Sequence, residues 1–201
     1  MKKFLMLLCM TLFLAACGNS VEKNNSKSSK KDEEVAVSGQ TDTDTKEDEV
    51  EESEVLKIQL EEKIIIEDIG EFSLKKNGFT RKVYPSNPGE DPVYFHLKDS
   101  EQILLNTVIS LKNLSISKKI ANEFISDYKY IYDNKYEYVP EVTIEKDGGS
   151  NFDIKLETII EPLQTGVFHF TGFLPSELEH DNKPLKFIFT VGENEYEFII
   201  R

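Results

Sequence analysis

The sequence predicts an all-β fold for residues 55–201, in the form of an antiparallel β-sandwich. Several segments alternate apolar and polar residues with a period of two, which is typical of half-buried strands. Short turn sequences separate these segments, and no stretch of about ten residues has the apolar spacing of an amphipathic helix. Seven to nine short strands without intervening helices favour two packed antiparallel sheets.

Four segments show the alternation most clearly. In each, we expect the apolar residues of one parity to face the core and residues of the other parity, such as Asn106, to face solvent. By the same rule His169 lies opposite Phe168 and Phe170, so we expect an exposed histidine. The residues expected to face inward are Ile103, Leu105, Ile109 and Leu111; Phe152, Ile154, Leu156 and Ile160; Leu185, Phe187, Phe189 and Val191; and Tyr196, Phe198 and Ile200.

Turn residues divide the chain between the expected strands, because Gly, Asp, Asn and Ser favour turn conformations. Pro85, Pro88 and Pro92 mark a loop before a strand at 93–97. Residues 176–179 follow a proline and predict a single helical turn. The expected turns are Asp99-Ser100, Asp133-Asn134, Asp147-Gly148-Gly149 and Gly192-Glu193-Asn194.

Five tyrosines gather around one expected hairpin. A three-residue loop at 133–135 pairs Tyr132 with Tyr136 and Tyr130 with Tyr138, and it places all five rings on one face. That face is either a wall of the sandwich core or an aromatic platform for a glycan or peptide. We expect a core wall, with the rings at the hairpin tip partly exposed. The five residues are Tyr128, Tyr130, Tyr132, Tyr136 and Tyr138.

The first seventeen residues predict an exported, lipid-anchored protein. Lys2 and Lys3 precede an apolar run at 4–14, which is too short to span a membrane because spanning takes about 20 apolar residues. Small residues and a cysteine follow, and this order resembles the lipobox of bacterial lipoproteins. The resemblance implies that residues 1–16 are a signal peptide and that diacylglycerol and palmitate are attached to the new N-terminal cysteine. The lipobox residues are Leu14, Ala15, Ala16 and Cys17.

Residues 17–54 predict a disordered acidic tether. The stretch 18–54 has no Phe, Tyr, Trp, Leu or Ile, so it cannot bury enough apolar surface to offset the entropy of ordering. Residues 17–54 carry five lysines against twelve acidic residues, and the whole chain has a net charge of −13. Phosphate backbones repel such an acidic chain, so we expect no nucleic-acid partner. Attachment to the membrane is then expected through the lipid anchor.

The histidines of the expected domain lack the spacing of a zinc site. No serine-hydrolase motif and no phosphate-binding loop occurs in the sequence. We therefore expect no catalytic residues, and we regard the histidines as ordinary surface or strand-edge residues. They are His96, His169 and His180.

Cysteine chemistry and metal binding are also disfavoured in residues 55–201. Both cysteines, Cys9 and Cys17, lie in the first seventeen residues, which excludes a cysteine nucleophile or a Cys-rich zinc site from the expected domain. Asp147, Asn151 and Asp153 could gather around Ca²⁺, but a hairpin turn explains these residue types. We expect no metal and no cofactor.

A family resemblance adds an expected fold and location. Residues 94–201 resemble an immunoglobulin-like domain of unknown function that is common in Gram-positive lipoproteins, and residues 64–84 match its first strands. The resemblance implies an immunoglobulin-like sandwich at the outer face of the cytoplasmic membrane, and no catalytic residue. Domains of this kind are often labelled as binding telomeric repeats, but that label conflicts with the net charge of −13, which disfavours binding to nucleic acid. The similar stretches are 102–113, 132–138, 160–163, 174–177 and 184–187.

These observations favour a non-enzymatic, lipid-anchored extracellular module that binds a protein or an envelope polymer. One alternative is an envelope-associated lipoprotein that captures a small ligand, and another is an envelope hydrolase. A deep pocket with converging polar groups would favour either alternative, whereas a flat face would favour the binding module.

Overall fold

The computed structural model describes residues 55–201. The predicted signal peptide, the lipobox with Cys17 and the predicted tether lie outside the described residues and remain predictions. Within the described part, no helix is long and apolar enough to cross a membrane.

Residues 55–201 form fifteen strands and two short 3-10 helices. The single helical turn predicted at 176–179 is confirmed as the second of these helices. The elements are β1 (Leu56–Ile58), β2 (Ile64–Ile66), β3 (Gly70–Thr80), β4 (Lys82–Val83), β5 (Phe95–His96), β6 (Gln102–Asn113), β7 (Lys119–Ile120), η1 (Ala121–Glu123), β8 (Ile125–Tyr132), β9 (Tyr136–Tyr138), β10 (Glu141–Lys146), β11 (Asn151–Asp153), β12 (Ile159–Ile160), β13 (Thr165–Pro175), η2 (Ser176–Glu179), β14 (Leu185–Val191) and β15 (Asn194–Ile199).

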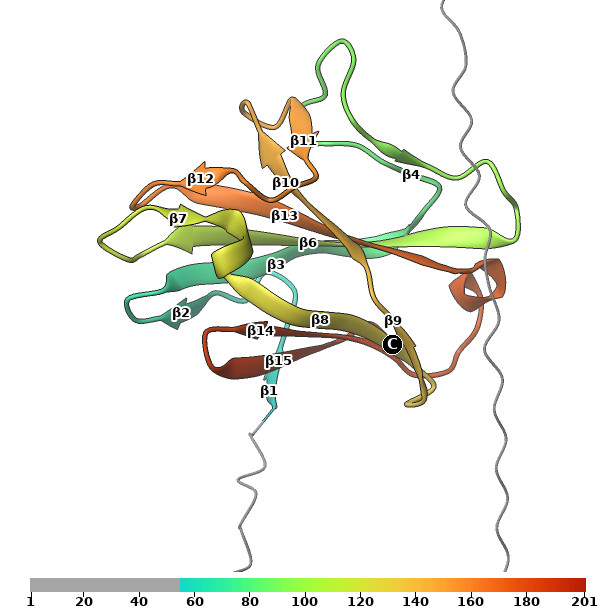
Figure 1. Ribbon diagram of the computed structural model, residues 1–201. Coiled ribbons are helices and arrows are strands. Elements are labelled where there is room, and N and C mark those ends of the chain that lie inside the picture. Colours follow the sequence, from blue (N-terminus) through green and yellow to red (C-terminus); the bar gives the residue numbers. More distant parts are fainter. Residues whose placement is uncertain (1–54) are drawn as a thin grey trace, which may run out of the picture. The chain divides into compact units, whose positions relative to one another are not determined.

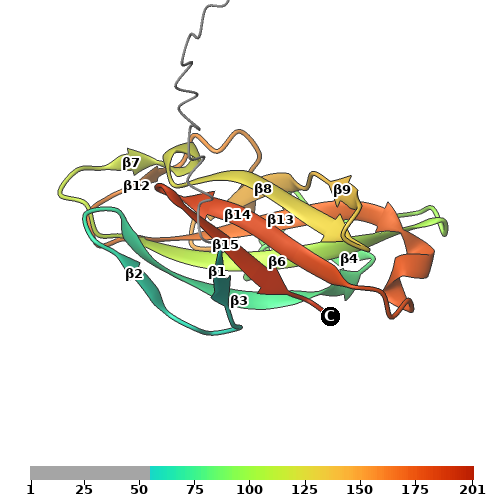
Figure 2. The ribbon, with the colours of Figure 1, turned by 90° about the horizontal axis from the view of Figure 1, so that it is seen from below.

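The strands build two main sheets that pack face to face, so the predicted all-β sandwich is confirmed (Figure 1). One sheet has the order β1-β15-β14-β8-β9, and the other has the order β11-β10-β13-β6-β3-β2. Figure 2 shows β14 and β15 crossing in front of β6 of the other sheet. The strand pairs are antiparallel except β1 with β15, which is parallel and departs from the prediction.

The apolar faces of the two sheets form the core between them. All four residues of β14 that were predicted to face inward are fully shielded from solvent, and the four predicted for β6 are at most 3% exposed. Strand β6 is central because it pairs with β13 on one side and with β3 on the other. The inward parity of these two strands could therefore be read from the sequence.

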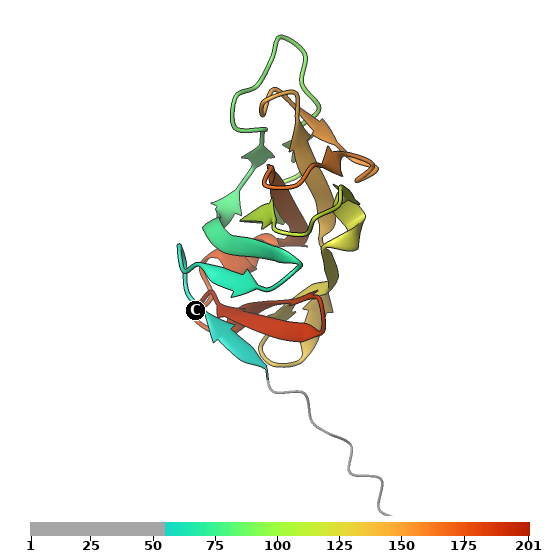
Figure 3. The same ribbon diagram turned by 90° about the vertical axis from the view of Figure 1, so that its left-hand side faces the viewer.

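Part of the opposite, outer face of the six-stranded sheet is also buried, and this overturns the prediction for Asn106 and His169. The segment that holds β4 and β5 covers it, on the far side of the sheet from β14 and β15 (Figure 3). Leu104, Val83 and Phe152 form a second apolar cluster there. Asn106 is 6% exposed and His169 is 5% exposed. The predicted solvent-facing histidine is therefore wrong, because alternation identifies the opposite face but not what covers that face.

Two other predicted strands are shorter than expected. Strand β11 ends at Asp153, so Ile154 is 62% exposed and does not continue the inward-facing series. Phe152 packs in the outer cluster rather than between the sheets. The strand predicted at 93–97 is reduced to the two residues of β5. In contrast, the predicted turn at Asp133 and Asn134 is confirmed, because both have the positive φ angles that turn residues tolerate.

Candidate binding site

The tyrosine hairpin has the predicted register. Tyr132 pairs with Tyr136 and Tyr130 pairs with Tyr138, across a loop at 133–135. The five rings nevertheless have different environments. Tyr130 and Tyr132 are buried, Tyr128 and Tyr138 are half-buried, and Tyr136 is 46% exposed.

Tyr130 belongs to the core. Its ring is fully shielded from solvent and packs against Gly172, where an added Cβ would lie 2.8 Å from the ring. Its hydroxyl hydrogen-bonds to Thr107 Oγ1 and to the Phe170 carbonyl oxygen, each at 2.8 Å. Burial raises the pKa of the Tyr130 hydroxyl, although the hydrogen bond with Thr107 lowers it in part. The predicted core wall is therefore correct for this ring.

Tyr132 differs from the prediction that the tip rings are partly exposed. It is only 7% exposed, and its hydroxyl donates a hydrogen bond to the Asp181 carboxylate. That hydrogen bond, together with burial, raises the pKa of the Tyr132 hydroxyl. The Lys183 ammonium also lies 5.7 Å from the ring centroid. The loop before β14 covers this tyrosine, and that contact is distant in sequence.

Tyr128 faces the space between the sheets, as its shared parity with Tyr130 predicts, and it lies at a bulge in β8. The pairing of β8 with β14 shifts register between Ile188 and Thr190, opposite Asp127 and Tyr128. Asp127 has a φ of 48°, a left-handed conformation that is uncommon for residues other than glycine. Bulges of this kind redirect side chains next to functional sites. The Tyr128 ring lies edge-on to Phe170, with the ring centroids 5.2 Å apart.

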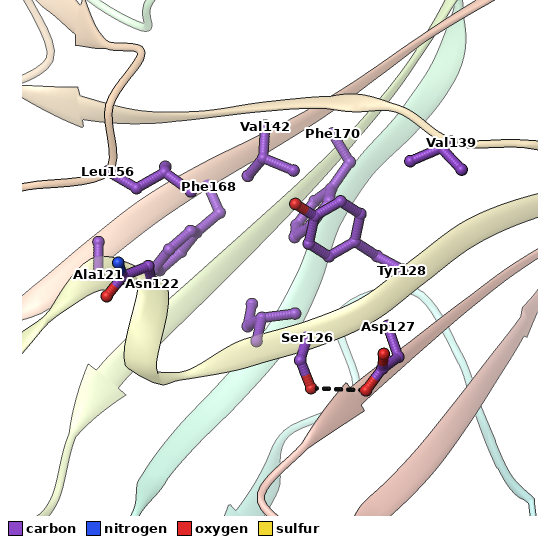
Figure 4. A pocket seen from close by; sticks show the side chains of 11 residues that line it. Ala121, Asn122, Ser126, Asp127, Tyr128, Val139, Val142, Leu156, Phe168 and Phe170 are labelled. Carbon is purple, nitrogen blue, oxygen red and sulfur yellow. Dashed lines mark hydrogen bonds between the residues drawn. The ribbon is translucent and has the colours of Figure 1, made fainter.

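Tyr128 forms one wall of an apolar cleft of about 370 Å³, which we call the inter-sheet cleft (Figure 4). It lies between β8 of one sheet and β10 and β13 of the other. Strand β9 pairs only with residues 130–132 of β8, so within the described chain no strand flanks Ile125 to Lys129 on that side. The lining residues are Ala121, Asn122, Ile125, Ser126, Asp127, Tyr128, Val139, Val142, Leu156, Phe168 and Phe170.

The chemistry of the inter-sheet cleft suits an apolar group with a polar end. Phe168 and Phe170 form its inner wall, while Val139 is 75% exposed. The polar side chains are those of Asn122, Ser126, Asp127 and the Tyr128 hydroxyl, and Ser126 donates a hydrogen bond to Asp127 (Figure 4). Pockets with apolar walls and a few polar groups are typical of ligand and peptide sites. Among the five candidate tyrosines, Tyr128 is the one that lines this cleft.

A second group of residues, missed by sequence reasoning, lies on the outer face of the six-stranded sheet. The side chains of His169 and Glu145 are each 7% exposed, and His169 Nε2 lies 2.9 Å from Glu145 Oε1. Ser86 donates to the same carboxylate from its hydroxyl and from its backbone N–H, each at 2.8 Å. Asn106 Nδ2 lies 3.3 Å from His169 Nδ1. We call these four residues the outer-face network.

The outer-face network holds Glu145 in its charged form. Burial alone would raise the pKa of Glu145, but the hydrogen bonds from His169 and Ser86 outweigh it and lower the pKa below its ordinary value. The order of contacts is serine, carboxylate, imidazole. In a hydrolytic triad the imidazole lies next to the serine and acts as its base. Here the Glu145 carboxylate lies between Ser86 and His169, so the three residues do not form such a triad. Its evident role is to pin the loop at Ser86 onto β10.

The remaining sequence candidates have local roles. Asn151 Oδ1 accepts hydrogen bonds from the Val93 and Phe152 backbone N–H groups. The Asp153 carboxylate accepts from Lys155 and Thr158. His180 has a side chain that is 85% exposed, and His96 stacks at 6.3 Å on Tyr94. Within residues 55–201, no three His, Cys, Asp or Glu side chains are grouped as metal ligands.

Comparison with solved structures supports the fold. The chain is similar to an uncharacterized β-sandwich protein from Clostridium difficile 630, known from a crystal structure. The similarity covers 75% of this chain and 97% of that one, with 22% sequence identity and a TM-score of 0.67. No family model and no curated protein matches the chain. At 22% identity, this similarity shows that the two proteins share a β-sandwich fold.

Proposed function

We propose that this chain is a lipid-anchored extracellular module that binds a partner protein and has no enzymatic activity. Its proposed location is the outer face of the cytoplasmic membrane, with Cys17 carrying the lipid. The lipobox sequence supports the anchor, and the resemblance to the immunoglobulin-like domain of Gram-positive lipoproteins supports the location. The confirmed β-sandwich is compatible with that resemblance.

The inter-sheet cleft, rather than the flat face expected from the sequence, is the observation that carries the binding role. It is open to solvent at one edge of the sandwich, and its walls are mainly apolar. Burial of an apolar side chain from a partner contributes about 25 cal/mol per Å² removed from water. A protein segment with a bulky apolar residue fits these walls better than a sugar polymer does, because a sugar needs more hydrogen-bonding groups than the cleft offers.

Photo-crosslinking in living cells tests the binding role. A benzoylphenylalanine at Val139 lies at the cleft, and one at the 67% exposed Ile65 is the matched surface control. We expect an adduct with one partner protein at position 139 and none at position 65. Tyr128→Glu should abolish the adduct by placing a charge in the cleft, while Tyr136→Glu should not.

Two results would contradict the binding role. The first is an equal yield of adduct at the two positions, which would indicate random collision. The second is persistence of the adduct in a folded Tyr128→Glu variant. Circular dichroism in the near ultraviolet verifies folding of both glutamate variants.

Cys17→Ala tests the anchor, and Cys9→Ala is its control because the latter residue lies inside the predicted signal peptide. Stable attachment takes two acyl chains, since each buried CH₂ contributes about 0.8 kcal/mol and one chain is marginal. We expect Cys17→Ala to leave the membrane fraction after a salt wash and Cys9→Ala to stay in it. A fully membrane-bound Cys17→Ala protein would contradict the lipobox interpretation.

A further inference from the structure

A second pocket, separate from the inter-sheet cleft, lies on the outer face of the six-stranded sheet. Its volume is about 540 Å³, and we call it the outer-face pocket. Strands β3, β6, β10 and β13 contribute its floor, and the segment 82–86 borders it. The lining residues are Lys76, Gly78, Phe79, Thr80, Lys82, Val83, Tyr84, Pro85, Ser86, Asn106, Val108, Glu145, Val167 and His169.

A glycine in a strand leaves this pocket open. Gly78 of β3 pairs with Asn106 of β6, and a Cβ added at Gly78 would meet no atom within 4 Å. A glycine inside a strand often marks a place where a ligand approaches the backbone. Next to it, Lys76 pairs with Val108, and Val108 pairs with His169. The missing side chain therefore opens the sheet surface beside Lys76 and Asn106.

The outer-face network fixes the border of the pocket. Ser86 is held to Glu145 by two hydrogen bonds, and the backbone N–H of Asn87 donates to the Gly149 carbonyl oxygen at 2.9 Å. Tyr84, at the same border, is 40% exposed and stacks on Tyr94 with a centroid distance of 4.6 Å. The segment is thus anchored on β10 and on the hairpin that follows it, and the pocket is preformed.

The charges around the pocket favour an anion. Lys76 and Lys82 line it, and within residues 55–201 neither ammonium pairs with a carboxylate. The one carboxylate in the lining is Glu145, whose side chain is 7% exposed and accepts hydrogen bonds from Ser86 and His169. Two free cations therefore face the pocket, while the single anion is already occupied by protein donors.

We propose that the outer-face pocket binds a small organic anion. Its carboxylate, phosphate or sulfonate group lies between Lys76 and Lys82, and its apolar body packs on Val83, Val108 and Val167. This site is independent of the proposed cleft, because His169 and Val167 project to the outer face whereas Phe168 and Phe170 project to the inner one.

Two fluorescent probes with related ring systems test the proposal. Anilinonaphthalene sulfonate carries a negative charge, and phenylnaphthylamine has the same aromatic body without the charge. We expect the purified chain to bind the sulfonate, with an affinity that falls as salt is raised because screening weakens ion pairing. The neutral probe reports on apolar sites, including the inter-sheet cleft, and its affinity should change little with salt.

The double variant Lys76→Gln, Lys82→Gln should bind the sulfonate about tenfold more weakly and leave the neutral probe within about twofold of the wild type. The pair Lys118→Gln, Lys119→Gln is the matched control, because it removes the same charge from lysines outside the pocket lining. That control should leave sulfonate binding within about twofold of the wild type.

Gly78→Leu provides a blocking variant that does not remove charge. The added side chain enters open space, so the variant should fold normally while sulfonate binding is lost. The proposal is overturned if the wild type fails to bind the sulfonate, if the two lysine pairs weaken it equally, or if a folded Gly78→Leu protein binds it as the wild type does. None of these results bears on the photo-crosslinking at Val139, so failure of one proposal is distinguishable from failure of the other.

Discussion

Both faces of the six-stranded sheet contain buried side chains, but the interactions that bury them differ. On the inner face, Leu74, Ile109 and Phe170 are fully shielded among apolar side chains of the other sheet. On the outer face, His169 and Thr143 are at most 5% exposed although both are polar. The inner face relies on a non-directional effect that tolerates many apolar residues. The outer face combines a small apolar cluster with hydrogen bonds between buried polar side chains, such as that of His169 with Glu145, and each of these bonds needs its partner.

This difference has consequences for mutation. Truncation of an apolar side chain on the inner face costs the transfer free energy of the removed atoms plus that of a cavity. Removal of a polar side chain on the outer face leaves its buried partner unsatisfied, and the desolvation of that partner then carries the cost. The two faces should therefore respond differently to truncation, to pH and to conservative substitution.

The largest effect is expected on the inner face, for Tyr130→Ala. Removing this fully buried ring should lower the free energy of unfolding by about 3–5 kcal/mol, because it opens a cavity next to Gly172. The control Tyr136→Ala, from the exposed tip of the same hairpin, should cost less than about 1 kcal/mol. Denaturant unfolding measures both. A stable Tyr130→Ala protein that loses partner binding would mean that this ring is part of a binding platform.

On the outer face, Glu145→Ala should cost about 1–3 kcal/mol, since it leaves Ser86 and His169 without their shared acceptor. The control Glu141→Ala lies four residues earlier on the same strand, where its side chain is exposed, and should cost less than about 0.5 kcal/mol. Urea denaturation compares the two variants. Equal stabilities would contradict the pinning role of the outer-face network.

The pH dependence of stability should depend on the same carboxylate. The pKa of Glu145 is lowered in the folded protein, so its ionisation contributes stability that is fully present above its ordinary pKa of 4.5. That contribution is lost as the pH falls through the lower, folded-state pKa. The stability difference between wild type and Glu145→Gln should therefore shrink as the pH is lowered below 4.5. A difference that stays constant in acid would rule out this titration.

The smallest expected effects, which have opposite signs, are those of replacing two buried threonines by valine. Thr107 Oγ1 bonds to Tyr130 and accepts from Asn77, so Thr107→Val should destabilise the protein by about 1 kcal/mol. The hydroxyl of Thr143, on the outer face, has no hydrogen-bond partner within residues 55–201. Thr143→Val should therefore stabilise by about 1 kcal/mol. Thermal melting of the pair checks the opposite signs, and a destabilised Thr143→Val would reveal a bridging water.

Local sequence rules determined much of the fold. The parity of β14, the turn at Asp133 and Asn134, the helical turn at Ser176 and the register of Tyr130 with Tyr138 were all predictable. Each depends on residues close together in the chain, where side-chain period and turn chemistry act directly. The part of the candidate site that follows from these rules is the presence of Tyr128 on the hairpin strand.

The tertiary structure alone decided which faces are covered and where the pockets lie. Glu145 and Ser86 meet across 59 residues of sequence, and this contact helps to bury His169, for which alternation predicts exposure. Likewise, the bulge at Asp127 lets Ile125 face the core, although its parity is opposite to that of Tyr130. Alternation has a period of two residues and distinguishes only one side of a strand from the other. What packs against each side depends on contacts between distant segments, which that local pattern does not contain.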